Sequence, residues 1–265
     1  MLNLIQADFY KMRKSLVIKI LFGITTLCSL AMVIMAYLIP LDRIKEGYSG
    51  IGFMFSDINM MSILGAVIAS IFICGDFDNK TIHDAISSGC SRGAIMVSKG
   101  VVFFFALAFI LLPYVIVTGI ALSTGVSFDM GGVAVGFLHI LTGESGITFD
   151  AYVFLKMQVA MLTLMIIYMA QLSICIPLAF VLRKPVLVIA IYYGFSILSG
   201  QLAVLSSSNK VFEKIYACTP FGGNYNFVTI GTESMDILQA IAVSIIFIMV
   251  MYIVTYRIFR KSEIN

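Results

Sequence analysis

The residues with the greatest potential for chemistry gather in one polar segment, GDFDNKTIHDAISSGCSRGAIMVSK, at positions 75–99. It contains Asp76, Asp78, His83 and Arg92, in a chain of which only 12% of the residues are charged. The segment lacks the G-x-x-x-x-G-K-[ST] spacing with which a P-loop holds nucleotide phosphates. We therefore predict that the chain does not hydrolyse ATP by itself.

Other patterns that carry chemistry are missing from the sequence. The chain has two histidines, too few for the clustered ligands of a metalloprotease, and it contains no G-x-S-x-G motif. Its five cysteines form no C-x-x-C pair, which argues against a zinc site or a disulfide framework. No basic run with interleaved aromatics indicates nucleic acid. We expect a protein that is not an enzyme, binds no cofactor directly and has no nucleic-acid partner.

The elements that position the polar segment are apolar helices. Hydrophobic residues make up 60% of the chain and the mean hydropathy is +1.04, whereas an ordinary soluble domain carries about 25% charged residues. This composition predicts an all-α membrane protein that forms a single transmembrane domain over residues 1–265. The six expected transmembrane helices are residues 16–39, 58–74, 100–123, 153–182, 186–205 and 237–258.

The first residues of the chain predict a further helix. Apolar residues at positions 2, 5, 9 and 12 alternate with charged ones at helical spacing. This pattern is typical of an amphipathic helix that lies in the membrane interface. A plain basic flank that sets the topology is the alternative, and the two interpretations are compatible.

The distribution of Lys and Arg predicts the orientation. Eleven of these residues fall on one side of the expected spans and four on the other, with the excess marking the cytoplasmic side. The eleven are Lys11, Arg13, Lys14, Lys80, Arg92, Lys99, Arg183, Lys184, Arg257, Arg260 and Lys261, and the four are Arg43, Lys45, Lys210 and Lys214. We expect a multi-pass protein of the cell membrane, as in a bacterial plasma membrane, with both termini and the polar segment in the cytoplasm.

Within the polar segment the pattern predicts a short helix that crosses between two spans. Asp76 or Asp78 can cap its start, residues 80–88 give two turns, Gly89 can end it, and Ser91 can cap the next helix. Its apolar face consists of Ile82, Ala85 and Ile86. Such a helix can transmit force from a docked protein, and a passive helix in the headgroups is the alternative.

The spans themselves contain little charge. No Asp, Glu, Arg or His lies near the middle of any expected span, which argues against an ion-coupled carrier. Their Gln, Ser, Thr and Tyr residues can hydrogen-bond between helices or line a pathway for a hydrophobic substrate. The outward loops at residues 124–152 and 206–236 are rich in Gly or aromatics, so each can cap the outward end of such a pathway or lie at the interface.

The polar segment resembles the membrane subunit of ATP-binding-cassette exporters of the type-2 permease family. Members have a basic N-terminal flank, six spans, an acidic F-x-x-E-x-x-x-GT-like start after the second span, and a Ser-Gly-Arg run before the third. The corresponding residues are Phe77, Asp78, Lys80, Thr81, Ile82, Ser87, Ser88, Gly89, Ser91, Arg92 and Lys99. The resemblance covers the layout of the whole chain but its motif only residues 75–99, where Asp78 replaces the more usual Glu.

The resemblance implies a permease subunit that moves a hydrophobic or amphipathic substrate outward, for example an antimicrobial peptide or a lipid-like molecule. It implies a separate ATPase subunit, which uses ATP and Mg²⁺, and a second permease subunit, identical or different. The ATPase would contact Asp76, Phe77, Asp78, Lys80, Thr81, His83 and Arg92. The substrate would contact Ser62, Ser196, Ser199 and Gln201 on the second and fifth spans.

The chain length without a fused ATPase resembles the small permeases of peptide-antibiotic immunity and bacitracin resistance. Two other functions remain open from the residues alone. One is a secondary carrier or channel that needs no ATPase, and the other is a non-transporting membrane scaffold or sensor.

Overall fold

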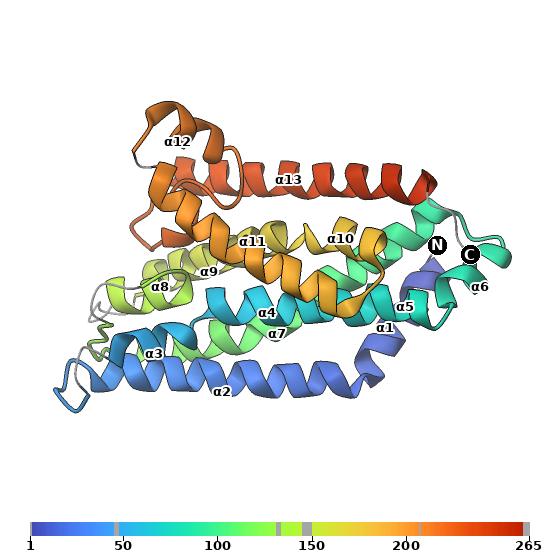
Figure 1. Cartoon of the computed structure of the whole chain (residues 1–265). Helices are drawn as coiled ribbons and strands as arrows, with labels where there is room; N and C mark the ends of the chain where they lie inside the picture. Colours follow the sequence, from blue (N-terminus) through green and yellow to red (C-terminus); the bar gives the residue numbers. More distant parts are fainter. Residues whose placement is uncertain (1, 45–47, 131–133, 145–149, 207, 262–265) are drawn as a thin grey trace.

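The structure is a computed structural model that describes residues 2–44, 48–130, 134–144, 150–206 and 208–261 (Figure 1). The chain is 81% helical, and no strand occurs in the described part, so the all-α prediction is confirmed. Lys45, which entered the orientation argument, lies outside the described residues.

Six helical segments of the described chain are long and apolar enough to cross a membrane, as predicted, and they indicate a multi-pass membrane protein. They are Leu16–Leu38, Ser49–Asp78, Arg92–Ser123, Ala151–Leu182, Pro185–Ser206 and Ser234–Lys261. Four correspond to the uninterrupted helices α2 (Leu16–Leu38), α7 (Arg92–Ser123), α11 (Pro185–Ser206) and α13 (Ser234–Lys261).

The other two segments are composite. The second consists of α3 (Ser49–Met54), α4 (Asp57–Ala69), the π-helix η2 (Ser70–Cys74) and α5 (Gly75–Asp78), and the fourth consists of α9 (Ala151–Leu172) and α10 (Cys175–Leu182). Pro177 lies in the first turn of α10, where its missing N–H is tolerated, so the interruption before it has a local cause.

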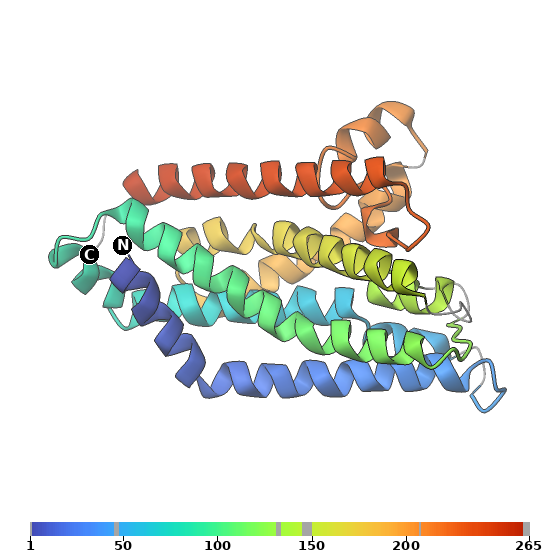
Figure 2. The same cartoon turned by 180° about the vertical axis from the view of Figure 1, so that it is seen from behind.

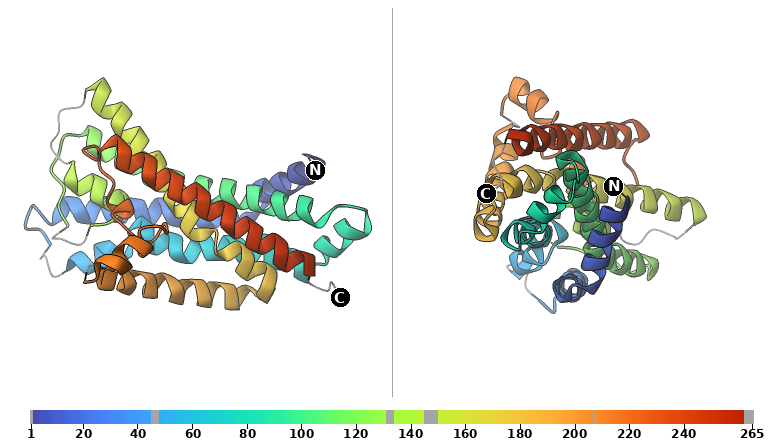
Figure 3. Two further views of the ribbon diagram at one scale, coloured as in Figure 1. Left: turned by 90° about the horizontal axis from the view of Figure 1, so that it is seen from above. Right: turned by 90° about the vertical axis from the view of Figure 1, so that its right-hand side faces the viewer.

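Shorter helices lie at the two ends of the bundle. At one end are α1 (Leu2–Lys14), α5 and α6 (Thr81–Ser87), and at the other are α3, α8 (Phe137–Gly143), α12 (Lys210–Tyr216) and the 3₁₀ turn η3 (Tyr225–Phe227) (Figures 1 and 2). Both chain termini and the turn at residues 183–185 also lie at the first end (Figure 3). We call it the basic end, because the last turns of α1 and α13 and this turn carry lysines and arginines, and we call the other the loop end.

The core forms around α4 and α7. Large side chains without solvent contact, such as Tyr114, Tyr168 and Phe137, fill the space between α4, α7, α8 and α9. By contrast, only 17% of the most apolar stretch of α11 and 11% of that of α13 is buried. These two helices therefore present their apolar surface to lipid or to another membrane helix.

The polar segment forms the predicted short helix, α6, with Ile82 buried and Ala85 and Ile86 half-buried beneath it. The predicted helix cap at Asp76 or Asp78 is wrong, because the second span continues without interruption through both residues to Asp78. Within this stretch the Asp76 carboxylate forms ion pairs with lysines from two other helices.

The chain then turns at Lys80, whose φ of 56° is left-handed, and Gly89, with φ of 86°, ends α6. Ser91 caps α7 as predicted, since its hydroxyl accepts a hydrogen bond from the Ala94 amide at 3.3 Å.

Candidate functional site

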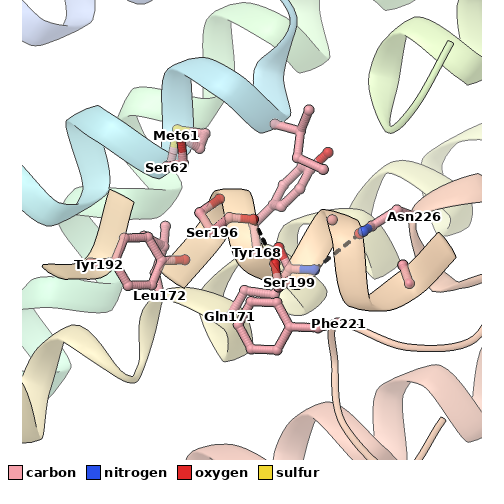
Figure 4. Close-up of a pocket in the computed structure, with 13 residues that line it drawn as sticks. Met61, Ser62, Tyr168, Gln171, Leu172, Tyr192, Ser196, Ser199, Phe221 and Asn226 are labelled. Atoms are coloured by element: carbon pink, nitrogen blue, oxygen red, sulfur yellow. Dashed lines mark hydrogen bonds between the residues drawn. The ribbon is translucent and has the colours of Figure 1, made fainter. Parts of the chain in front are cut away.

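A cavity of about 100 Å³ lies between the second, fourth and fifth spans (Figure 4). Three of the four residues predicted to contact a substrate, Ser62, Ser196 and Ser199, line it together. The fourth, Gln201, is exposed on α11 and does not line it. The remaining lining residues are Ile58, Met61, Tyr168, Gln171, Leu172, Tyr192, Gly200, Ala203, Phe221 and Asn226.

The cavity is weakly polar and contains no charged side chain among these lining residues. The hydroxyl of Ser62 donates to the Asn59 carbonyl at 2.7 Å, and that of Ser199 donates to the Ser196 carbonyl at 2.7 Å. These donors are satisfied within their own helices, so both hydroxyls offer the cavity mainly acceptor lone pairs. The lining suits an apolar or amphipathic ligand.

The segment from Tyr216 to Asn226 covers the cavity at the loop end. Gln171 donates to the Pro220 carbonyl at 2.8 Å and to Asn226 Oδ1 at 3.1 Å. The Tyr216 hydroxyl donates to the Ser199 carbonyl at 2.7 Å. These bonds join α9 and α11 to the loop above them, so the loop has the position of a cap over the cavity.

A buried carboxylate that sequence reasoning did not single out lies next to the cavity. Asp57, the first residue of α4, is fully buried, and its Oδ2 accepts hydrogen bonds from the Tyr168 hydroxyl and, at 3.2 Å, from the Phe137 amide. No hydrogen-bond partner reaches its Oδ1 within the described residues. Asp57 thereby joins the start of α8 to α4 and to a residue of the cavity wall. An acid directly before an apolar run was the only sequence signal for it.

At the basic end, one of the two acids expected to contact the ATPase, Asp76, lies inside the helical bundle. Asp76 is fully buried and forms ion pairs with Lys11 of α1 and Lys99 of α7. Lys99 also pairs with Asp8 of α1 at 2.5 Å, and the Ser98 hydroxyl donates to the same carboxylate at 2.6 Å. We call Asp8, Lys11, Asp76, Ser98 and Lys99 the anchor cluster. Asp8, Asp76 and Lys99 are buried, whereas the Lys11 side chain is 45% exposed. The two acids and two bases balance in charge, which compensates for much of the cost of burying the first three.

Two other residues of the expected ATPase contact also face inward. Phe77 packs edge-on against Phe180 with ring centroids 5.6 Å apart, and Arg183 lies over its ring at 4.9 Å. Arg92 donates to the Phe259 carbonyl at 2.8 Å and to the Arg260 carbonyl at 3.1 Å, so it holds the last turn of α13.

The remaining residues of that expected contact are exposed on one short stretch around α6. They are Asp78, Lys80, Thr81 and His83. The structure therefore divides the seven predicted residues into an inner group that fixes the polar segment and an outer group that a partner can reach.

A π-helix separates the cavity from the anchor cluster along the second span. η2 covers Ser70–Cys74, between Ser62 in the cavity wall and Asp76 in the cluster. Ser70 donates to the carbonyls of Ala66 at 2.8 Å and Pro185 at 3.1 Å, which joins this element to the start of α11. Short π-helical stretches are rare and occur frequently at functional sites. No sequence pattern indicated it.

Within the described part of the chain, no group of three His, Cys, Asp or Glu side chains is arranged to hold a metal ion. No protein-family model matches the chain, and no curated protein matches its sequence.

Proposed function

We propose that the chain is the permease subunit of an ATP-driven exporter in the cell membrane, energised by a separate ATPase subunit on the cytoplasmic side. One observation carries the proposal. A single helical segment, Ser49–Asp78, lines the cavity with Met61 and Ser62 and ends in the anchor cluster at Asp76. A movement of the Asp76 end of this segment would therefore also move the wall of the cavity.

The exposed residues around α6 are the proposed docking surface for the ATPase. Asp78 and Lys80 offer charges of both signs beside the exposed His83 and Thr81, as complementary contacts with a soluble partner require. Because the anchor cluster ties α5 to α1 and α7, a push on this surface moves three helices together. The N-terminal helix α1, proposed to lie in the membrane interface, takes part in this movement.

The lining of the cavity supports a hydrophobic or amphipathic substrate, such as a peptide or a lipid-like molecule. Its volume of about 100 Å³ is below the roughly 300–1,000 Å³ of pockets that hold drug-sized ligands. The conformation described is therefore closed to such a substrate, and export requires the cavity to open. In the proposal a second permease subunit, identical or different, meets this one across the exposed faces of α11 and α13.

The docking surface is tested by exchanging its charges. The double variant Asp78→Lys, Lys80→Glu keeps the net charge, and we expect it to abolish retention of an ATP-hydrolysing subunit when the chain is purified from native membranes. The matched control Lys210→Glu, Glu213→Lys makes the same exchange on exposed residues of α12 at the loop end and should retain that subunit. Full retention of the ATPase activity by the first variant, with an unchanged melting temperature, would show that the surface is not the docking site.

A second candidate function, a proton-coupled carrier, is favoured by Asp57. A buried carboxylate with an unpartnered oxygen beside a cavity is the kind of group that such carriers use. Uptake of a fluorescent amphipathic peptide into inverted membrane vesicles separates the two functions. An exporter needs ATP and tolerates a protonophore, whereas a proton-coupled carrier works without ATP, stops with the protonophore and fails in Asp57→Asn.

A further inference from the structure

A groove of about 450 Å³ lies at the junction of α1, α2 and α7, and its lining residues belong neither to the cavity nor to the proposed docking surface. Aromatic and aliphatic side chains form its floor, and two cations, Arg13 and Lys19, stand among its lining residues. The apolar members are Phe9, Tyr10, Met12, Ile18 and Phe109.

The groove results from the break between α1 and α2. Ser15 between them is extended, with φ of −64° and ψ of 122°, so the two helices leave it in different directions (Figure 2). Phe9 packs edge-on against Phe105 at 4.9 Å between ring centroids, and Phe109 stacks on Phe22 at 4.7 Å. These aromatic contacts fix α1 and α2 on the surface of α7 and leave the hollow open between them.

The two cations of the groove have no acidic partner among the residues that the structure describes. Neither Arg13 nor Lys19 forms an ion pair with an acid of the described chain. The acid nearest in sequence on α1, Asp8, is buried and already engaged by Lys99 and Ser98. Both cations are exposed, and Lys19 lies about 5 Å along α2 from its first residue, at the depth where a lysine reaches the headgroup layer.

We propose that this groove binds one anionic phospholipid of the leaflet at the basic end. Its acyl chain lies along Phe9, Met12 and Phe109, and its phosphate lies between Arg13 and Lys19. The guanidinium of Arg13 presents paired N–H donors that match phosphate oxygens, and Lys19 adds a second positive charge. A soluble phosphate compound would pair with the cations but leave the apolar floor uncovered. An apolar protein helix would cover the floor but leave both cations without an anionic partner. A phospholipid satisfies both features.

Native mass spectrometry from micelles that contain equal amounts of phosphatidylglycerol and phosphatidylcholine tests the proposal. We expect the unmodified chain to retain one phosphatidylglycerol in preference to phosphatidylcholine. The variant Arg13→Gln, Lys19→Gln should lower that retention at least fivefold. The control Lys184→Gln, Lys261→Gln removes the same charge from exposed residues at the same end and should leave retention unchanged. Melting temperatures in phosphatidylcholine verify that both variants are folded.

Three results would overturn the proposal. They are equal retention of the two lipids by the unmodified chain, unchanged phosphatidylglycerol retention in Arg13→Gln, Lys19→Gln, and displacement of the lipid by an equal concentration of glycerol 3-phosphate. The last would identify a site for free phosphate compounds instead. None of these results affects the proposed exporter function, which depends on other residues.

Discussion

Asp76 is the residue whose structural position most changes the interpretation of the polar segment. It follows an apolar run and is followed by Asp78 and Lys80, a context that is typical of a surface loop. In the folded chain its carboxylate is enclosed by Lys11 and Lys99, so no partner can reach it directly. Asp76 therefore positions the docking surface, while the neighbouring Asp78 belongs to that surface.

The anchor cluster leads to a stability prediction. Asp76→Asn removes the buried partner of Lys11 and one of the two acids that pair with Lys99. Because Lys11 is 45% exposed and Lys99 keeps Asp8, we expect a loss of about 1–3 kcal/mol of unfolding free energy. Denaturant unfolding in detergent measures this loss. Asp78→Asn is the matched control, because the side chain is exposed and its removal should cost less than about 0.5 kcal/mol. Equal stability of the two variants would contradict the role of Asp76 as an anchor.

At the scale of elements, α8 is fixed to the bundle through one glycine. Gly136 has φ of 66°, and a Cβ at this position would collide with the Asp57 carboxylate and the Tyr168 hydroxyl. Its amide also donates to the Asn226 carbonyl at 2.8 Å, which connects α8 to the loop over the cavity. Only glycine lets α8, α4, α9 and this loop meet at one point.

Two glycine substitutions separate backbone strain from steric contact. Gly125 also has positive φ, 68°, but open space surrounds its missing Cβ. We expect Gly125→Ala to cost about 1–2 kcal/mol from strain alone, and Gly136→Ala to cost clearly more because Asp57 and Tyr168 must move as well. Thermal unfolding of both variants in the same detergent measures the difference. A Gly136→Ala variant no less stable than Gly125→Ala would show that the loop end adapts freely.

At the scale of the whole molecule, both termini and the polar segment lie at the basic end, as an even number of spans requires (Figure 1). We propose that the basic end faces the cytoplasm, because Lys and Arg are in excess at that end. Cys218 provides an internal reference, since it is an exposed cysteine of the loop segment that caps the cavity.

Labelling with a membrane-impermeant maleimide checks the orientation. On intact cells we expect Cys218 to react, while Lys80→Cys in a background lacking Cys90 and Cys218 should react only after the membrane is opened. The reason is that position 80 is exposed on the proposed cytoplasmic side. Reaction at position 80 in intact cells, without reaction at Cys218, would reverse the orientation and exclude the proposed docking surface for a cytoplasmic ATPase.

The sequence alone determined the six spans, the short helix after the second span and the Ser91 cap. These features are local, because the length of an apolar run and the chemistry of a cap depend on neighbouring residues. The resemblance implies substrate contacts at Ser62, Ser196, Ser199 and Gln201. The first three line one cavity and Gln201 does not, and their use as substrate contacts stays a prediction.

Only the tertiary structure decided which charges are buried and which are exposed. Lys99 and Asp8 lie 91 positions apart, and Lys11 and Asp76 lie 65 apart, so no local pattern connects them. Their pairing depends on how α1, α5 and α7 are rotated when they pack, and so does the burial of Asp57 beneath α8. Helix rotation is fixed by contacts between distant segments, which is why the polar segment was recognisable from the sequence but its anchor was not.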